Sequence, residues 1–106
     1  MIYNDMKNIL EITENPVEKL ETVMDFGRGL QPIPDGANCT EIAGCSSFVQ
    51  ICYKDGRFYA DADSAIVRGI VAILLAMIDG KSVQEIKNMN MIDEFKSLNL
   101  NLGAAR

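Results

Sequence analysis

The strongest constraint on the fold is a long apolar segment that runs from residue 63 to residue 79. Gly80 ends this segment, and acidic residues stand at its start, where the positive end of a helix dipole favours them. Between its ends, Arg68 is the one charged side chain. Because a helix that is apolar all round cannot face water, the pattern predicts a buried central helix. We expect Asp61 or Asp63 to cap it, which explains this pair better than acid–base catalysis does.

Small residues recur along this segment at spacings of four, three and four, at Ala65, Gly69, Ala72 and Ala76. Residues at such spacings share one face of a helix. The stripe therefore predicts a close approach by another backbone, and a bulky residue at position 69 should overpack the core.

Upstream of the helix, residues 48–53 and 57–60 have the aromatic, branched and small side chains of β-strands. Asp55 and Gly56 between them are typical of a tight hairpin turn. A further strand near residues 40–42 would complete a sheet. Alternation places the two sets of side chains on opposite faces, with Val49, Ile51 and Tyr53 on one face and Phe48, Gln50 and Cys52 on the other.

Capping residues predict further helices that begin after Asn4, Asn15, Ser82 and Asn90. The order of helices, hairpin and helices indicates the α+β class, with a small antiparallel sheet packed against several helices. A chain of 106 residues fits one compact domain, 1–106.

Composition excludes several functions. The ten Lys and Arg residues are scattered among fifteen Asp and Glu residues, so no basic stripe exists to bind nucleic acid. The longest apolar stretch, 70–78, is far shorter than the ~20 residues that span a bilayer, and the N-terminus does not resemble a signal peptide. We therefore expect a cytoplasmic protein without membrane contact.

The sequence contains three cysteines, at positions 39, 45 and 52, and no histidine. The absence of imidazole removes Cys-His dyads and His metal ligands. The cysteine spacing lacks the paired hooks of zinc sites, so we expect no metal and no cofactor. In the cytoplasm the cysteines should be reduced thiols, with Cys52 as a small apolar strand residue and Cys39 in a loop. For Cys45, an inert buried thiol is the commoner alternative to a reactive one.

Two motifs resemble the SufE family of iron–sulfur assembly proteins. The run IAGCSSFV is similar to the family's Gly-Cys-x-Ser-x-Val-Trp signature, which is met at Gly44, Cys45, Ser47 and Val49. The run DADSAIVRGIVAILLAMIDG is similar to the family's Asp-x-Asp-Ala-x-Ile-Val-Lys/Arg-Gly helix start. The chain departs from the family at Gln50, where Trp is usual, at Glu41, where a basic or neutral residue is commoner, and in lacking a C-terminal helix after Arg106.

The resemblance implies a SufE/IscU-like fold and a carrier protein rather than an enzyme. Its cysteine, Cys45, would accept persulfide sulfur from a SufS-like cysteine desulfurase, stimulate that enzyme, and pass the sulfur to a SufBCD-like scaffold. A thiolate can attack the terminal sulfur of a persulfide without a metal. Gly44 permits a sharp turn, Ser46 and Ser47 can donate to the sulfur, and Arg68 is a further supporting candidate, expected to reach the surface or to pair with a carboxylate.

Two alternatives remain at this point. One is an IscU-type iron–sulfur cluster scaffold, which needs several convergent ligands. The other is a thiol-dependent sulfurtransferase or peroxidase in which Cys45 turns over small molecules.

Overall fold

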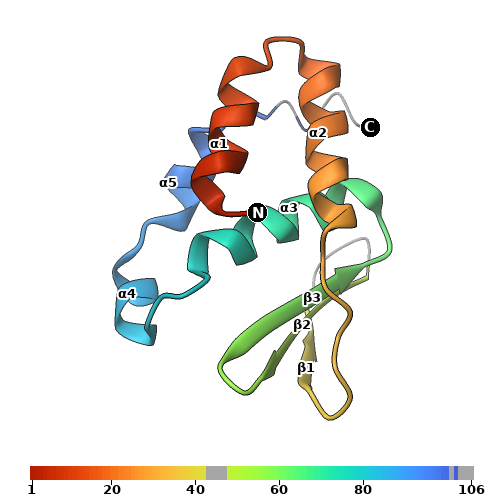
Figure 1. Ribbon diagram of the computed structural model, residues 1–106, viewed down its shortest axis with the longest axis vertical. Coiled ribbons are helices and arrows are strands. Elements are labelled where there is room, and N and C mark those ends of the chain that lie inside the picture. The colour runs from red at the N-terminus through yellow and green to blue at the C-terminus, as the bar shows by residue number, and fades with distance from the viewer. Residues whose placement is uncertain (43–47, 101, 103–106) are drawn as a thin grey trace.

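The computed structural model describes residues 1–42, 48–100 and 102. The elements are α1 (Tyr3–Ile12), α2 (Pro16–Arg28), β1 (Asn38–Glu41), β2 (Val49–Lys54), β3 (Arg57–Ala62), α3 (Ala65–Ile78), α4 (Val83–Asn88) and α5 (Met91–Lys96). The strands form one antiparallel sheet in the order β1-β2-β3. Figure 1 shows the sheet at one end of the molecule, with α3 crossing between it and the pair α1 and α2. The α+β class is confirmed.

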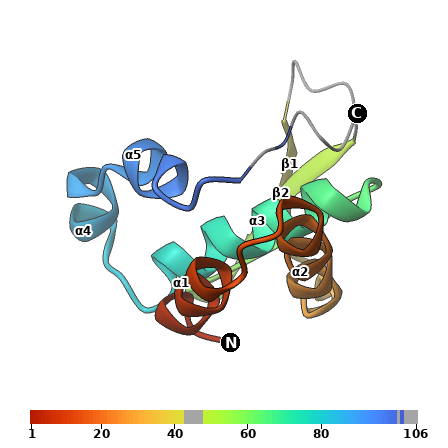
Figure 2. The same cartoon turned by 90° about the horizontal axis from the view of Figure 1, so that it is seen from above.

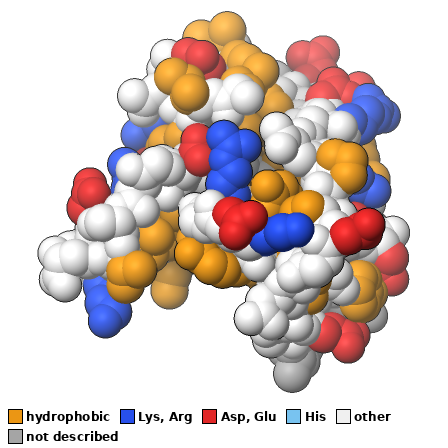
Figure 3. All heavy atoms as spheres, turned by 60° about the horizontal axis from the view of Figure 1, so that its bottom comes forward, with side chains coloured by type: hydrophobic (Ala, Val, Ile, Leu, Met, Phe, Trp, Pro, Cys, Tyr) orange, Lys and Arg blue, Asp and Glu red, His pale blue; other side chains and the backbone are white. Residues whose placement is uncertain are grey.

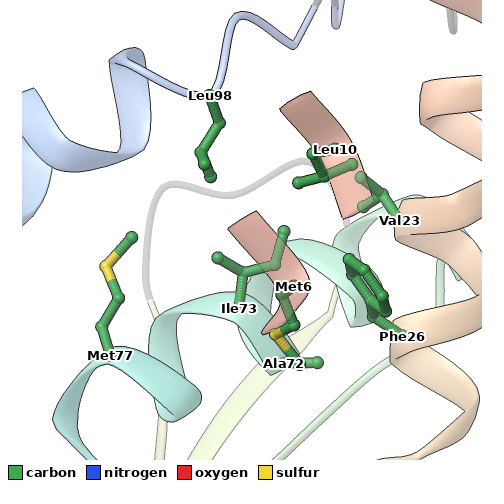
Figure 4. Packing of buried hydrophobic residues seen from close by; sticks show 8 residues of the cluster. All are labelled: Met6, Leu10, Val23, Phe26, Ala72, Ile73, Met77 and Leu98. Atoms are coloured by element: carbon green, nitrogen blue, oxygen red, sulfur yellow. The ribbon is translucent and has the colours of Figure 1, made fainter. Parts of the chain in front are cut away.

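The central position predicted for α3 is also confirmed, because two apolar clusters share this helix. The first cluster contains Met6, Leu10, Val23, Phe26, Ala72, Ile73, Met77 and Leu98. Figure 4 shows these side chains converging between α1, α2 and α3, with Leu98 approaching from the chain after α5. The second cluster joins the sheet to α3 through Val49, Ala60, Ala62 and Val71. Helices α4 and α5 lie on the side away from the sheet (Figure 2).

The start of α3 differs from the prediction. Ser64, rather than Asp61 or Asp63, is the N-cap, and its hydroxyl oxygen accepts from the backbone N–H of Val67. Asp61 is unavailable as a cap because β3 continues through Ala62, which pairs with Val49. Strand pairing with a distant segment thus decided the boundary that local capping rules misplaced.

Among the other helix starts, three of the four predicted caps are confirmed. The side chain of Asn15 accepts from two backbone N–H groups of α2, and Ser82 with Glu85 forms a reciprocal capping box. Asn90 accepts from the backbone N–H of Asp93. The prediction of an Asn4 cap is wrong, because α1 begins two residues earlier, after Ile2, which makes no side-chain cap. α1 is stabilised by burial of its apolar face in the core rather than by a side-chain cap.

The hairpin has the predicted turn and faces. Asp55 and Gly56 both have positive φ, at 50° and 83°, as a type I′ turn requires. Val49 and Ile51 pack toward α3, so the opposite set of β2 side chains lies on the outer face of the sheet. No helix in the described part of the chain is long and apolar enough to cross a membrane.

Two glycines bring the backbones of α2 and α3 into contact. A Cβ atom added at Gly69 would lie 2.0 Å from the carbonyl oxygen of Val23. A Cβ atom added at Gly27 would lie 2.6 Å from the backbone nitrogen of Gly69. The small-residue stripe therefore marks a helix crossing at its Gly69 position, with a second glycine opposite that the sequence pattern did not reveal.

Helix α5 is tied to α1 by one carboxylate. The Tyr3 hydroxyl donates to Glu94 Oε2 at 2.7 Å, and Lys7 Nζ lies 3.1 Å from the same oxygen. The hydrogen bonds from Tyr3 and Lys7 hold the pKa of Glu94 below its ordinary value of 4.5. Burial and the bond to Glu94 in turn raise the pKa of Tyr3.

Glu94→Gln should destabilise the protein by roughly 0.5–1 kcal/mol at pH 7, a modest value because the carboxylate is partly exposed. The contribution of a carboxyl with a lowered folded pKa is present above its unfolded pKa and is lost as the pH falls through the folded pKa. The stability gap between wild type and variant should therefore close below a pH of about 4.5. Urea unfolding at several pH values measures this gap. Glu14→Gln, at an exposed carboxylate, is the control variant. A stability difference between wild type and Glu94→Gln that persists unchanged at pH 3 would contradict the ion-pair explanation.

Candidate functional site

The segment that carries the predicted sulfur acceptor joins two paired strands. Gly44, Cys45, Ser46 and Ser47 lie outside the described residues. On either side of them, the backbone N–H of Ile42 donates to the carbonyl oxygen of Val49 at 2.8 Å. The chain therefore leaves β1 and re-enters β2 at directly opposed positions, held by the sheet.

Arg68 lies in the first turn of α3 and pairs with a strand residue. Its Nη1 is 3.6 Å from Asp61 Oδ1, which also accepts from the backbone N–H of Ala62 at 2.9 Å. In the sheet register Asp61 opposes Gln50, the second residue of β2. Arg68 therefore stands near the end of the sheet at which residues 43–47 begin and end, and its predicted pairing with a carboxylate is confirmed.

Arg68→Met should leave the predicted persulfide uptake intact and lower the free energy of unfolding by at most about 1 kcal/mol. The reason is that both partners of the ion pair are more than a third exposed, so solvent screens their attraction, while Met retains an apolar stem. Sulfur loading followed by mass spectrometry, beside urea unfolding, checks both expectations. Unchanged stability with loss of uptake would instead make Arg68 part of the site.

The expectation that Cys39 and Cys52 are separate reduced thiols is wrong for this structure, because they form a disulfide. They are directly opposed in the register of β1 and β2, and their Cα atoms are 4.0 Å apart. Cys52 is 1% exposed, as expected for a strand residue, but its sulfur is covered on the outer face of the sheet. Cys39 is exposed and lies in β1 rather than in a loop.

The register of β1 on β2 explains why these two cysteines can pair. Ile42 and Val49 form a hydrogen-bonded pair. Along an antiparallel ladder such pairs alternate with non-hydrogen-bonded pairs, in which the two side chains lie closer together. A residue pair that lies an odd number of positions away from Ile42 and Val49 is therefore of the second kind. Cys39 and Cys52 both lie three residues from that pair. A third strand was predicted near residues 40–42, but no register was assigned to it, and the cysteine pair therefore went unrecognised.

A cleft of about 640 Å³ lies elsewhere, between the helices and β3. Its walls include Met6, Phe26 and Ala72, with Asp25 and Arg57 among its charged residues. Figure 3, which views the sheet end, shows apolar side chains gathered in the middle of this face with acidic and basic groups interspersed around them. Arg68 is not among the residues that line the cleft, so the cleft and this candidate site residue are separate.

Within residues 1–42, 48–100 and 102, no three His, Cys, Asp or Glu side chains converge in a way that could hold a metal ion. The disulfide also removes two thiolates as ligands, because each of these sulfurs is already bonded to the other. In this state, the chemistry that the cysteines offer is thiol chemistry at one position of the sequence, Cys45.

Comparison with known proteins gives a consistent set of relatives. The family model SufE, described as an Fe-S metabolism associated domain, matches residues 4–105. The chain is 33% identical over 90 residues to the Sulfur acceptor protein CsdE of Escherichia coli, covering 78% of this chain and 61% of that protein. It is 30% identical over 94 residues to the Cysteine desulfuration protein SufE of Wigglesworthia glossinidia brevipalpis, covering 82% and 65%. The chain thus spans somewhat less than two thirds of the length of these two relatives.

Proposed function

The chain belongs to the SufE family, and from this premise we propose that it accepts persulfide sulfur on Cys45 from a cysteine desulfurase during iron–sulfur cluster assembly. The names of the relatives support the proposal, since one is a sulfur acceptor protein and another a cysteine desulfuration protein. The motif around Cys45 supports the choice of residue.

The observation that carries the choice of Cys45 is the disulfide between the other two cysteines. Cys39 and Cys52 each use their sulfur for the bond to the other, so in this state neither offers a thiolate. Cys45 is the remaining cysteine of the sequence. It belongs to the segment whose two ends are fixed by the Ile42–Val49 hydrogen bond, at the rim of the sheet.

The proposed transfer is a thiol exchange in which sulfur atoms and electrons balance. The Cys45 thiolate attacks the terminal sulfur of the persulfide on the desulfurase cysteine. The new S–S bond forms on Cys45, the old one breaks, and the electron pair leaves on the desulfurase thiolate. No oxidant is consumed, and Cys45 becomes a persulfide that the next thiol acceptor can attack in the same way.

The deciding experiment mixes the protein with a cysteine desulfurase, cysteine and pyridoxal phosphate and follows its intact mass. We expect the gain of one sulfur atom, removed by dithiothreitol, and peptide mapping that places this sulfur on Cys45. Omission of cysteine is the control. Sulfur found only on other residues, or no uptake with an active desulfurase, would refute the proposal.

An IscU-type scaffold is the alternative from another functional class, and iron and sulfide reconstitution distinguishes it. A scaffold should turn brown and gain visible absorbance, whereas a sulfur carrier should stay colourless. A scaffold needs several convergent ligands, and two of the three cysteines of this chain are bonded to each other. We therefore favour the carrier.

Our proposal also treats the protein as a carrier rather than a sulfurtransferase enzyme, with a SufBCD-like scaffold as recipient and the cytoplasm as location. A carrier should be loaded once per molecule and should not turn over thiosulfate or small persulfides without a desulfurase. Measuring sulfide or thiocyanate release from such donors tests this distinction, and sustained turnover would favour an enzyme.

A further inference from the structure

Cys39 and Cys52 form a pair whose two sulfurs differ in their access to solvent. Cys39 belongs to β1, in which all four residues are exposed. Cys52 lies in the middle strand and is 1% exposed. A thiol arriving from solution can therefore reach the sulfur of Cys39 more readily than that of Cys52, and which sulfur is attacked governs the course of thiol–disulfide exchange.

The neighbours of Cys52 suit it to be the departing thiolate. On the outer face of the sheet it is flanked by Cys39 on β1 and by Tyr59 on β3, its partners in the two registers. Along its own strand, Gln50 Nε2 lies 3.3 Å from Cys52 Sγ as a hydrogen-bond donor. A donor aimed at the sulfur stabilises the charged form that is released when the disulfide opens.

From this asymmetry we propose that Cys39 and Cys52 are a reversible thiol–disulfide site, opened by a low-molecular-weight thiol that attacks Cys39. In the first step the thiolate bonds to Cys39 Sγ, the Cys39–Cys52 bond breaks, and the electron pair leaves on Cys52. In the second step another thiolate attacks the mixed disulfide, releases the oxidised small molecule and leaves Cys39 as a thiolate. Two small thiols are oxidised to one disulfide for each protein disulfide reduced, and both protein thiolates take up protons from water.

Opening this bond changes how β1 is attached. In the oxidised form the edge strand is joined to β2 by a covalent bond and by its backbone hydrogen bonds. In the reduced form the hydrogen bonds alone remain, among them Ile42 N–H to Val49 at 2.8 Å. Reduction should therefore speed hydrogen exchange at the Ile42 amide.

The test uses the full chain with Cys45→Ser, so that its outcome is independent of the proposed sulfur acceptance. Native protein is equilibrated in buffers of reduced and oxidised glutathione, quenched with acid, and alkylated. We expect a reversible transition in which two alkyl groups enter together, on Cys39 and Cys52. A pair that glutathione opens only after denaturation, or that never forms with oxidised glutathione, would overturn the proposal.

Direction is tested by two matched variants in the same Cys45→Ser background. With Cys52→Ser, Cys39 is left alone and should form a glutathione adduct readily. With Cys39→Ser, the buried Cys52 should react at least about tenfold more slowly under the same native conditions. Circular dichroism checks that each variant is folded. If either variant is unfolded, the glutathione titration of the Cys45→Ser protein still decides whether the pair opens reversibly. Equal rates in two folded variants would overturn the directed attack on Cys39.

Gln50→Met keeps the length of the side chain and removes the donor. We expect glutathione to reduce the pair severalfold more slowly in this variant than in the parent, because the released Cys52 thiolate loses its hydrogen bond. An unchanged rate would overturn the assignment of Gln50 to this role.

Discussion

Cys45→Ser is expected to abolish persulfide uptake while leaving the fold unchanged. A hydroxyl is nearly the size of a thiol, so the substitution is nearly isosteric. It is neither a soft nucleophile nor able to hold sulfane sulfur as a stable persulfide. After incubation with a desulfurase and cysteine, the intact mass of the variant should show no added sulfur, whereas the wild type should gain one atom.

The matched control is the double variant Cys39→Ser/Cys52→Ser, which removes the disulfide and retains Cys45. It should lose stability, because closing the loop between these residues restricts the unfolded chain. At temperatures where it remains folded, its sulfur uptake should match that of the wild type. Wild-type uptake by the Cys45→Ser variant, or no uptake by a folded double variant, would contradict the assignment of Cys45.

Gly69→Ala is expected to destabilise the protein by about 1–3 kcal/mol, although alanine is the better helix former by about 1 kcal/mol. The added methyl would lie 2.0 Å from the Val23 carbonyl oxygen, which belongs to a helix backbone and cannot rotate away. The helices must therefore move apart. Urea unfolding measures the loss, and Gly69→Leu should cost still more.

Gly27→Ala and Gly29→Ala provide a paired comparison on α2. Gly27 faces Gly69 across the helix crossing. Gly27→Ala should lower the free energy of unfolding by an amount similar to that for Gly69→Ala, because the added methyl would lie 2.6 Å from a backbone nitrogen. At Gly29 the nearest atom would be 3.3 Å away and φ is −84°, so the change should be close to neutral. A Gly69→Ala variant more stable than the wild type would show that the two helices separate at little cost.

Local patterns predicted most of the fold because its main elements carry their own signals. The apolar run of α3, the Asp55-Gly56 turn and the Ser82 capping box each depend on neighbouring residues, and each was found. Errors occurred where distant segments decide the structure. The start of α3 depends on the pairing of β3 with β2, and α1 is fixed by its buried face.

Residue patterns predicted less of the candidate site than of the fold. Cys45 and its neighbours were identified through a family resemblance, and they lie outside the described residues. The sequence predicted that Arg68 would reach the surface or pair with a carboxylate, and the structure identifies Asp61 as its partner. The Cys39–Cys52 disulfide was missed because the register of β1 on β2 brings together two residues separated by 13 positions. Spacing along the chain is silent about such a pair.

The position of α3 between two apolar clusters links the stability of the sheet to that of the helices. Ala72 and Ile73 on this helix complete the helical cluster, and Val71, beside them in sequence, completes the cluster on the sheet. Neither layer can lose α3 and keep its core, so the two should melt together as one cooperative unit. A partner that binds only the sheet would consequently stabilise α1 and α2 as well, although it touches neither of them.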